Sequence, residues 1–129
     1  MANYRIYFDS KMLDDALLKQ YVTPNIIQES SQYVESIAQG LGVPASAIAT
    51  PTPFMVSQLA LFWAYMTTAW RKAQFSVGKS ADNDSFSLKH KLFYNMLNDL
   101  LDRITADTFT NGQSAKKRTF PSTMEISRN

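Results

Sequence analysis

The chain has 129 residues and a mass of 14.6 kDa, the size of one ordinary domain. Hydrophobic residues make up 45% and charged residues 19%, a balance that favours a globular fold over a disordered chain. The absence of cysteine excludes a disulfide scaffold, a thiolate zinc site and a cysteine nucleophile. A single histidine excludes a histidine metal cluster, and a net charge of +2 is too small to indicate a nucleic-acid partner by itself.

The first 22 residues combine an alternating pattern with a helical one. Tyr4, Ile6 and Phe8 alternate with more polar positions, which predicts a short strand or an extended arm. From Ser10, a suitable N-cap, a helix is expected to continue to Tyr21. The inner face of this helix is expected to consist of Leu13, Leu17 and Leu18.

Clear start and stop signals bound the second predicted helix, over residues 23–42. Thr23 is a good N-cap, Pro24 suits the first helical position, and Gly40 and Gly42 supply the C-terminal stop. The connector over residues 43–53 contains three prolines, so neither a regular helix nor a central strand is expected there, only a short helical turn at 45–49. Helical spacing assigns the inner face of the second helix to Ile26, Ile27, Tyr33, Val34, Ile37 and Leu41.

The third and fourth predicted helices supply most of the core. The third, over residues 52–76 with Thr52 as its cap, is apolar on almost every side and is expected to be the most deeply buried. A polar loop over 76–84 then leads to an amphipathic helix over 85–105, capped by Asp84. On the third helix, the stripe Phe62, Trp63, Met66 and Trp70 is interpreted as core, with one tryptophan reaching a subunit interface. The residues expected to be largely buried are Leu59, Phe62, Trp63, Met66, Phe93, Leu97 and Leu100.

The last 24 residues differ in character from the rest of the chain. Helical periodicity ends near Thr105, which divides the protein into a bundle over 1–105 and an extended C-terminal arm over 106–129. Within this arm Pro121 blocks a helix, while large apolar residues are spaced as strand-like anchors for a partner. The residues predicted to bind a partner are Lys116, Lys117, Arg118, Phe120, Pro121, Met124 and Ile126.

Residues that could carry catalysis have simpler structural explanations. The carboxylate pairs Asp14–Asp15, Asp82–Asp84 and Asp99–Asp102 fit helix starts or a solvated helix face, and no nucleophile motif is present. His90 lies between two lysines, which is typical of a surface or boundary position. We therefore expect no enzyme, with no catalytic residue, cofactor or metal ion.

The start of the chain shows no basic head followed by an apolar core, the pattern of a secretion signal. The longest apolar run, Leu59–Met66, has about eight residues, whereas a membrane span needs roughly 20. From these patterns we expect a soluble protein that is made in a cytosol.

Three strings in order resemble the small head-to-tail connector proteins of tailed bacteriophages, also called adaptor or head-completion proteins. They are GVPASAI at 42–48, QLALFWAYMTTAW at 58–70 and DNDSFSLKHKLFYNMLNDLLDRIT at 82–105. The resemblance implies an all-α helical bundle of about four helices without catalytic residues. Its copies would form a ring, usually a dodecamer, beneath the portal protein in the virion neck, after synthesis in the cytoplasm of the host bacterium. Such a ring extends the DNA channel without sequence-specific contact and carries the tail or further neck proteins, while the C-terminal arm reaches the portal.

Segment charges suggest how neighbouring copies would meet. Residues 1–53 carry a net charge of −2, and residues 54–105 carry +2. In a head-to-tail ring, basic residues of one copy would face acidic residues within 9–35 of the next. The alternative function is a small helical regulatory or nucleic-acid-binding module whose basic tail contacts DNA or RNA. The basic residues expected at the contact between copies are Arg71, Lys72, Lys79, Lys89 and Lys91.

Overall fold

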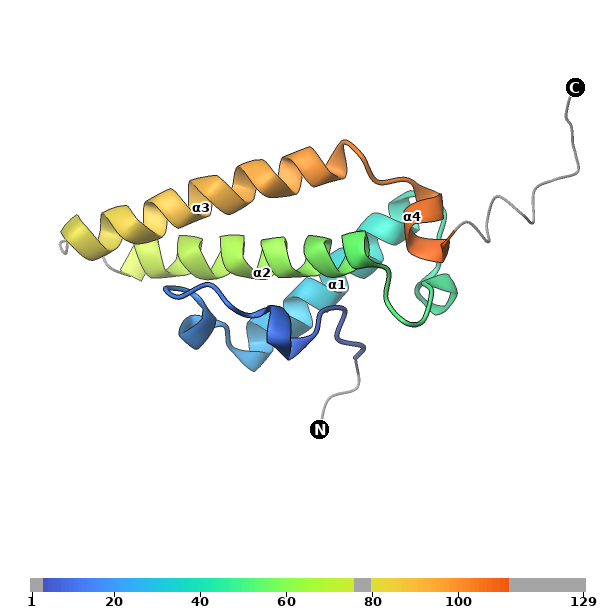
Figure 1. Ribbon diagram of the computed structural model, residues 1–129, viewed down its shortest axis with the longest axis horizontal. Coiled ribbons are helices and arrows are strands. Elements are labelled where there is room, and N and C mark those ends of the chain that lie inside the picture. Colours follow the sequence, from blue (N-terminus) through green and yellow to red (C-terminus); the bar gives the residue numbers. More distant parts are fainter. Residues whose placement is uncertain (1–3, 76–79, 112–129) are drawn as a thin grey trace, which may run out of the picture.

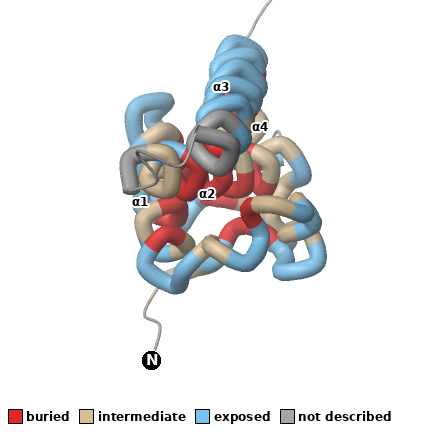
Figure 2. Tube along the Cα trace, turned by 90° about the vertical axis from the view of Figure 1, so that its left-hand side faces the viewer, coloured by how far each residue is buried: buried red, intermediate tan, exposed pale blue. Residues whose placement is uncertain are grey.

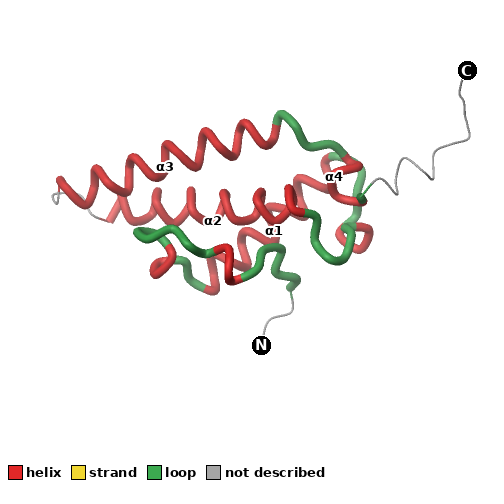
Figure 3. Tube along the Cα trace, in the orientation of Figure 1, coloured by secondary structure: helices red, strands yellow, loops and turns green. Residues whose placement is uncertain are grey.

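The computed structural model describes residues 4–75 and 80–111, which form an all-α fold with no strand among them (Figures 1 and 3). The helical bundle expected from the sequence is therefore confirmed. Short 3-10 turns lie in the N-terminal segment and in the connector, and are η1 (Ser10–Met12), η2 (Lys19–Tyr21) and η3 (Ala45–Ala47). The α-helices are α1 (Pro24–Gly40), α2 (Phe54–Phe75), α3 (Ser80–Leu101) and α4 (Ala106–Thr110).

Helix α2 lies at the centre of the bundle, as its apolar sequence predicted. It runs along α3, and α1 crosses its other side, so that the buried residues concentrate along α2 (Figures 1 and 2). Leu59 is fully buried, and Tyr65, on another side of the helix, is 2% exposed. Phe62, Trp63 and Met66 are partly buried and pack against the core from its edge, so they lie less deep than Leu59. The fully buried residues of α2 are Val56, Leu59, Ala60, Ala64 and Ala69.

Helix α1 begins and ends where its signals predicted. The Thr23 hydroxyl accepts a hydrogen bond from the Ile26 amide (3.2 Å), and Pro24 occupies the first turn. After Gly40 the chain turns through Gly42, whose φ of 85° is accessible to glycine at little cost. The buried face differs from the predicted one, because small residues bring α1 close to the core while Leu41 stays exposed. This face consists of Ile26, Ser30, Ser31, Val34 and Ala38.

The N-terminal segment is neither the predicted strand nor the predicted helix over 10–21. Successive residues Tyr7 and Phe8 are both buried while Ile6 is 49% exposed, so the side chains do not alternate as in a strand. The Asp15 carboxylate accepts hydrogen bonds from the Leu17 and Leu18 amides. Aspartate side chains compete with helical hydrogen bonds in this way, and only the short turns η1 and η2 form.

The N-terminal segment is nevertheless fixed to the body of the protein. The Arg5 guanidinium donates to the carbonyl oxygen of Ile48 (3.0 Å) and to the Thr52 hydroxyl (2.8 Å). The Ser57 hydroxyl donates to the carbonyl oxygen of Tyr7 (2.7 Å). These bonds join residues 43 to 50 positions apart and tie the segment to the connector and to the start of α2.

Helix α3 starts earlier than the sequence suggested. It begins at Ser80, so Asp84 lies inside the helix and the predicted loop over 76–84 is shorter. The sequence gives no clear start signal here, because the first turn contains several polar residues that could cap a helix and no proline. The described part of α3 buries Phe86, Phe93, Leu97 and Leu100.

The boundary between bundle and arm is also displaced from its predicted position after residue 105. Residues Ala106–Thr110 form the short helix α4, with Thr105 in a capping box with Thr108. Phe109 is completely buried, and its carbonyl oxygen accepts a hydrogen bond from the Ala49 amide (2.8 Å). The bundle therefore includes α4, and the predicted extended conformation is wrong for this helix. The rest of the predicted arm, residues 112–129, lies outside the described residues.

Candidate self-association surfaces

Two of the predicted intermolecular contacts turn out to lie within one chain. Lys89 Nζ lies 2.8 Å from Asp15 Oδ2, and Arg71 donates to Glu29 Oε1 over 2.8 Å. Both acids belong to the predicted acidic region, 9–35, and both bases to the predicted basic set. These two bases were expected to face acids of a neighbouring copy, and the structure pairs them with acids of their own chain instead. Lys89 and Arg71 are not available for a neighbour in the way the sequence suggested.

The other members of the basic set have separate positions. Lys72 Nζ lies 4.3 Å from the centroid of the Tyr21 ring, a cation–π contact that again joins α2 to the N-terminal segment. Lys91 is exposed on the polar face of α3. Lys79 lies outside the described residues. Of the basic residues predicted to meet another copy, Lys91 is the one that is both described and exposed.

One flank of α3 forms an apolar groove with α2, which we call the Trp70 groove. It has a volume of about 350 Å³. Trp70 is 50% exposed and Tyr94 is 49% exposed, and the His90 ring stacks on the Tyr94 ring with centroids 6.0 Å apart. The sequence placed Trp70 in the core or at an interface, and the structure leaves half of it exposed. The groove is lined by Trp63, Met66, Thr67, Trp70, His90 and Tyr94.

The opposite flank of α3 carries a second, aliphatic groove, which we call the Leu88 groove. Its volume is about 430 Å³. Leu88 is 68% exposed and Leu92 is 46% exposed. Sequence analysis missed both residues, although two leucines four apart and outside the main apolar stripe were a detectable signal. The groove is lined by Leu17, Ser85, Leu88, Lys89 and Leu92.

Helix geometry places these two grooves on different sides of α3. Residues two apart in an α-helix point about 200° apart around its axis. Leu88 and Leu92 form one pair of neighbours four apart, and His90 and Tyr94 form the other. Each pair is displaced by two residues from the other, so the aliphatic and aromatic surfaces face away from each other. One subunit thus presents two unlike apolar surfaces.

The residues considered for catalysis whose side chains the structure describes have structural roles or lie at the surface. Asp15 caps a turn and pairs with Lys89. Burial alone would raise the pKa of its carboxyl group. The hydrogen bonds from Lys89 and from the Leu18 and Leu17 amides outweigh that effect and hold the pKa below its ordinary value. Asp14, Asp99 and Asp102 are exposed. Within residues 4–75 and 80–111 no group of three or more acidic or histidine side chains is placed to hold a metal ion.

The most perturbed tyrosine also has a structural role. Burial, and then the Glu35 carboxylate to which the Tyr7 hydroxyl donates (2.7 Å), raise the pKa of Tyr7 above its ordinary range. Tyr7 therefore stays neutral at physiological pH and joins the N-terminal segment to α1. Its neutral hydroxyl serves as a hydrogen-bond donor there.

The residues predicted to bind a partner, Lys116 to Ile126, all lie outside the described part of the chain. No helix in the described part has the length and apolar character needed to cross a membrane. No family model, curated protein sequence or solved structure matches this chain.

Proposed function

We propose that this protein is a structural component that assembles head to tail into a ring, as a head-to-tail connector in the neck of a tailed-phage virion. The observation that carries the proposal is the pair of unlike apolar grooves on opposite flanks of α3. Exposed apolar surfaces of this kind mark interaction sites in proteins that otherwise cover such groups.

Two different surfaces on one subunit favour a particular symmetry. A two-fold dimer pairs one patch with an identical patch, whereas a ring pairs one patch with a different one. In the proposed ring, Leu88 and Leu92 of one copy pack into the Trp70 groove of the next. Trp70 and Tyr94 supply the aromatic area that is enriched at the centre of protein interfaces.

Paired variants test this arrangement directly. We expect Leu88→Glu and Trp70→Glu each to prevent ring formation, measured by light scattering coupled to size exclusion and by electron microscopy. A 1:1 mixture of the two variants retains one intact contact per pair, so it should give a heterodimer and nothing larger. Asn95→Glu places the same charge on the exposed polar face of α3 and should leave assembly unchanged.

Other outcomes of the same experiment would contradict the proposal. A wild-type chain that remains monomeric at high concentration has no self-association for these grooves to mediate. Rings that persist in both single variants would place the contact elsewhere. A dimer that is lost in both variants and does not reappear in the mixture would indicate a two-fold interface.

The position in the virion rests on the resemblance of the sequence to phage connectors. In the proposed assembly the ring lies beneath the portal protein, lets packaged DNA pass without sequence-specific contact, and carries the tail or further neck proteins. The C-terminal residues Lys116 to Ile126 are the proposed contact with the portal. The test is electron microscopy of the protein mixed with the portal protein encoded in the same genome, where a ring must appear on the portal's end.

The alternative, a nucleic-acid-binding module, places its contact in the basic tail, which lies outside the described residues, and the described helices add little basic surface to it. Lys89 and Arg71 are neutralised by Asp15 and Glu29, and Lys72 lies over Tyr21 rather than on a free basic surface. A salt titration separates the two functions. Affinity for DNA or RNA that falls steeply with salt would favour the nucleic-acid module, whereas ring formation depends mainly on apolar contact.

A further inference from the structure

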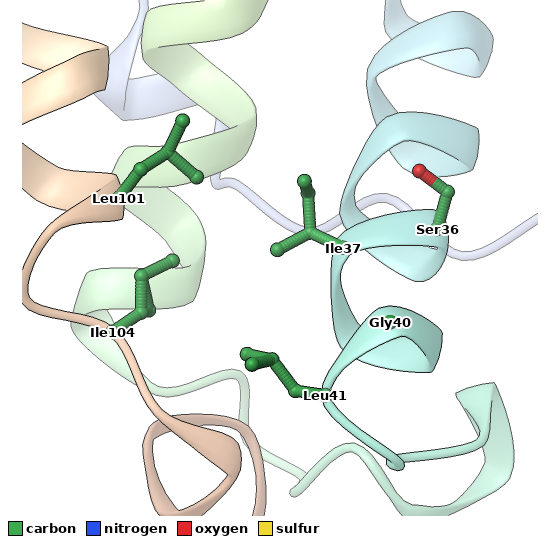
Figure 4. A pocket seen from close by; sticks show the side chains of 6 residues that line it. All are labelled: Ser36, Ile37, Gly40, Leu41, Leu101 and Ile104. Carbon is green, nitrogen blue, oxygen red and sulfur yellow. The ribbon is translucent and has the colours of Figure 1, made fainter.

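A third groove lies at the end of the bundle where α1 and α3 finish, and we call it the α1–α3 groove. Figure 4 shows Ile37 and Leu41 pointing from the α1 side toward Leu101 and Ile104 on the other side. Its volume is about 320 Å³, and Leu41 on its rim is 42% exposed. The residues that line it are Ser36, Ile37, Gly40, Leu41, Leu101 and Ile104.

The electrostatic character of this end favours a positively charged occupant. Both α1 and α3 end here, and the C-terminal end of a helix carries a partial negative charge. Neither helix has a basic residue in its last turn to offset that charge. Asp102, next to the groove residue Leu101, is exposed as well. Arg103, just beyond α3, donates to the carbonyl oxygen of Asp99 (3.4 Å) and partly offsets the charge at the end of α3, so the end of α1 is the one without a basic residue beside it.

The chain itself supplies a segment with matching chemistry. After Asn111, which ends α4 with a φ of 56°, the sequence continues for 18 residues. The basic triplet Lys116–Arg118 is followed two positions later by Phe120, the first large apolar residue after α4. A cationic group beside an aromatic one matches an apolar groove flanked by the C-terminal end of α1.

The C-terminal segment is also long enough to reach the α1–α3 groove. The groove residue Ile104 lies seven positions before Asn111, and five of the residues between them form helix α4. Because a helix rises little per residue, the distance from Ile104 to Asn111 is short. The nine residues from 112 to 120 span up to about 30 Å when extended. A tethered segment of this length has an effective concentration on the order of millimolar, far above that of a free partner.

We propose that the α1–α3 groove binds the C-terminal segment of its own chain, with Phe120 in contact with Leu41 and Leu101 and the triplet 116–118 against the end of α1. This inference goes beyond the proposed ring and portal contacts, since it concerns the isolated chain. In the proposed assembly, the portal competes with the groove for the same side chains.

Methyl NMR of the full chain tests the proposal. An aromatic ring shifts the resonances of methyl groups that it touches, so Phe120→Ala should move the Leu41 and Leu101 methyl signals. Signals of Leu88 and Leu92, on the flank of α3, serve as the internal reference and should stay in place. Ser122→Ala, a change in the same segment that removes no large side chain, is the matched control and should move none of them.

A second variant changes the groove instead of the segment. Gly40 lines the groove, and a Cβ at this position would meet no atom within 4 Å, so Gly40→Leu starts from open space. We expect its melting temperature to be no lower than that of the wild type, because leucine also favours a helix more than glycine does. The Phe120 ring signals should shift to their positions in the denatured chain.

The contradicting outcomes are distinct from those of the ring experiment. Leu41 and Leu101 methyl signals that are identical in Phe120→Ala and wild type would overturn the proposal. Leu41 and Leu101 signals that change on dilution of Trp70→Glu, which lacks the proposed ring contact, would assign the segment to a second copy instead. Neither result bears on the Leu88 and Trp70 variants, whose measured quantity is the mass of the assembly.

Discussion

Lys89 on α3 and Asp15 in the N-terminal segment form an ion pair over 2.8 Å across 74 positions of sequence. The Asp15 side chain is 9% exposed, and it also accepts hydrogen bonds from the amides of Leu17 and Leu18. One carboxylate therefore shapes the turn before η2 and fastens that turn to α3. Removing its charge should loosen a contact between two distant parts of the chain.

We predict that Asp15→Asn lowers the free energy of unfolding at pH 7 by about 1–2 kcal/mol. Because the folded-state pKa of Asp15 is below its unfolded value of 3.8, the charge stabilises the fold above that pH. This stabilisation is lost as the pH falls through the folded pKa, so wild type and variant should converge in acid. Urea unfolding measured from pH 7 down to pH 2 checks the trend, and Asp14→Asn, at an exposed neighbour, is the control.

Depth of burial should order the effects of truncation along α2. Leu59 is fully buried, so Leu59→Ala should cost about 2–5 kcal/mol of unfolding free energy. Phe62 is only half-buried and contacts the Phe93 ring at a centroid distance of 6.0 Å, so Phe62→Ala should cost less than Leu59→Ala. Thermal unfolding of both variants measures the two costs. A larger loss of stability in Phe62→Ala than in Leu59→Ala would mean that α2 is rotated relative to the core.

Two buried hydroxyl groups should respond to removal in opposite ways. Thr68 is 1% exposed, and its hydroxyl has no hydrogen-bond partner among the described residues. Thr68→Val removes a desolvated polar group at nearly the same shape, so we expect unfolding free energy to rise by about 1 kcal/mol. Ser57→Ala removes a bond of 2.7 Å to the Tyr7 carbonyl oxygen and should be destabilising. Equal losses of unfolding free energy in Thr68→Val and Ser57→Ala would contradict this difference in hydrogen bonding between the two hydroxyl groups.

The end of the folded body can be located by shortening the chain. Deleting residues 112–129 should leave helical circular dichroism almost unchanged, because α4 and its contacts remain. Deleting residues 106–129 removes Phe109, which is fully buried, and should destabilise the protein severely. Phe109→Ala in the full chain should itself cost about 3–5 kcal/mol. If Phe109→Ala unfolds at the wild-type temperature, the boundary predicted from sequence, after residue 105, was correct.

Much of the helical framework could be predicted because its signals are local. Thr23 and Pro24 started α1, Gly42 turned the chain after it, and the prolines of the connector kept it free of long helices. The apolar content of α2 predicted the central helix. Each of these signals acts through the backbone of a few neighbouring residues, so the sequence alone was enough to interpret it.

The candidate surfaces depended on contacts that sequence patterns do not contain. Leu88 and Trp70 are ordinary apolar residues of helices, and only the packing of the elements around α2 and α3 decides that they stay exposed. In the same way, segment charges predicted that bases after residue 54 of one copy face acids within 9–35 of the next copy. Only the packing of segments 74 positions apart decided that Lys89 meets Asp15 within one chain, because the sequence does not show which charges the fold brings together.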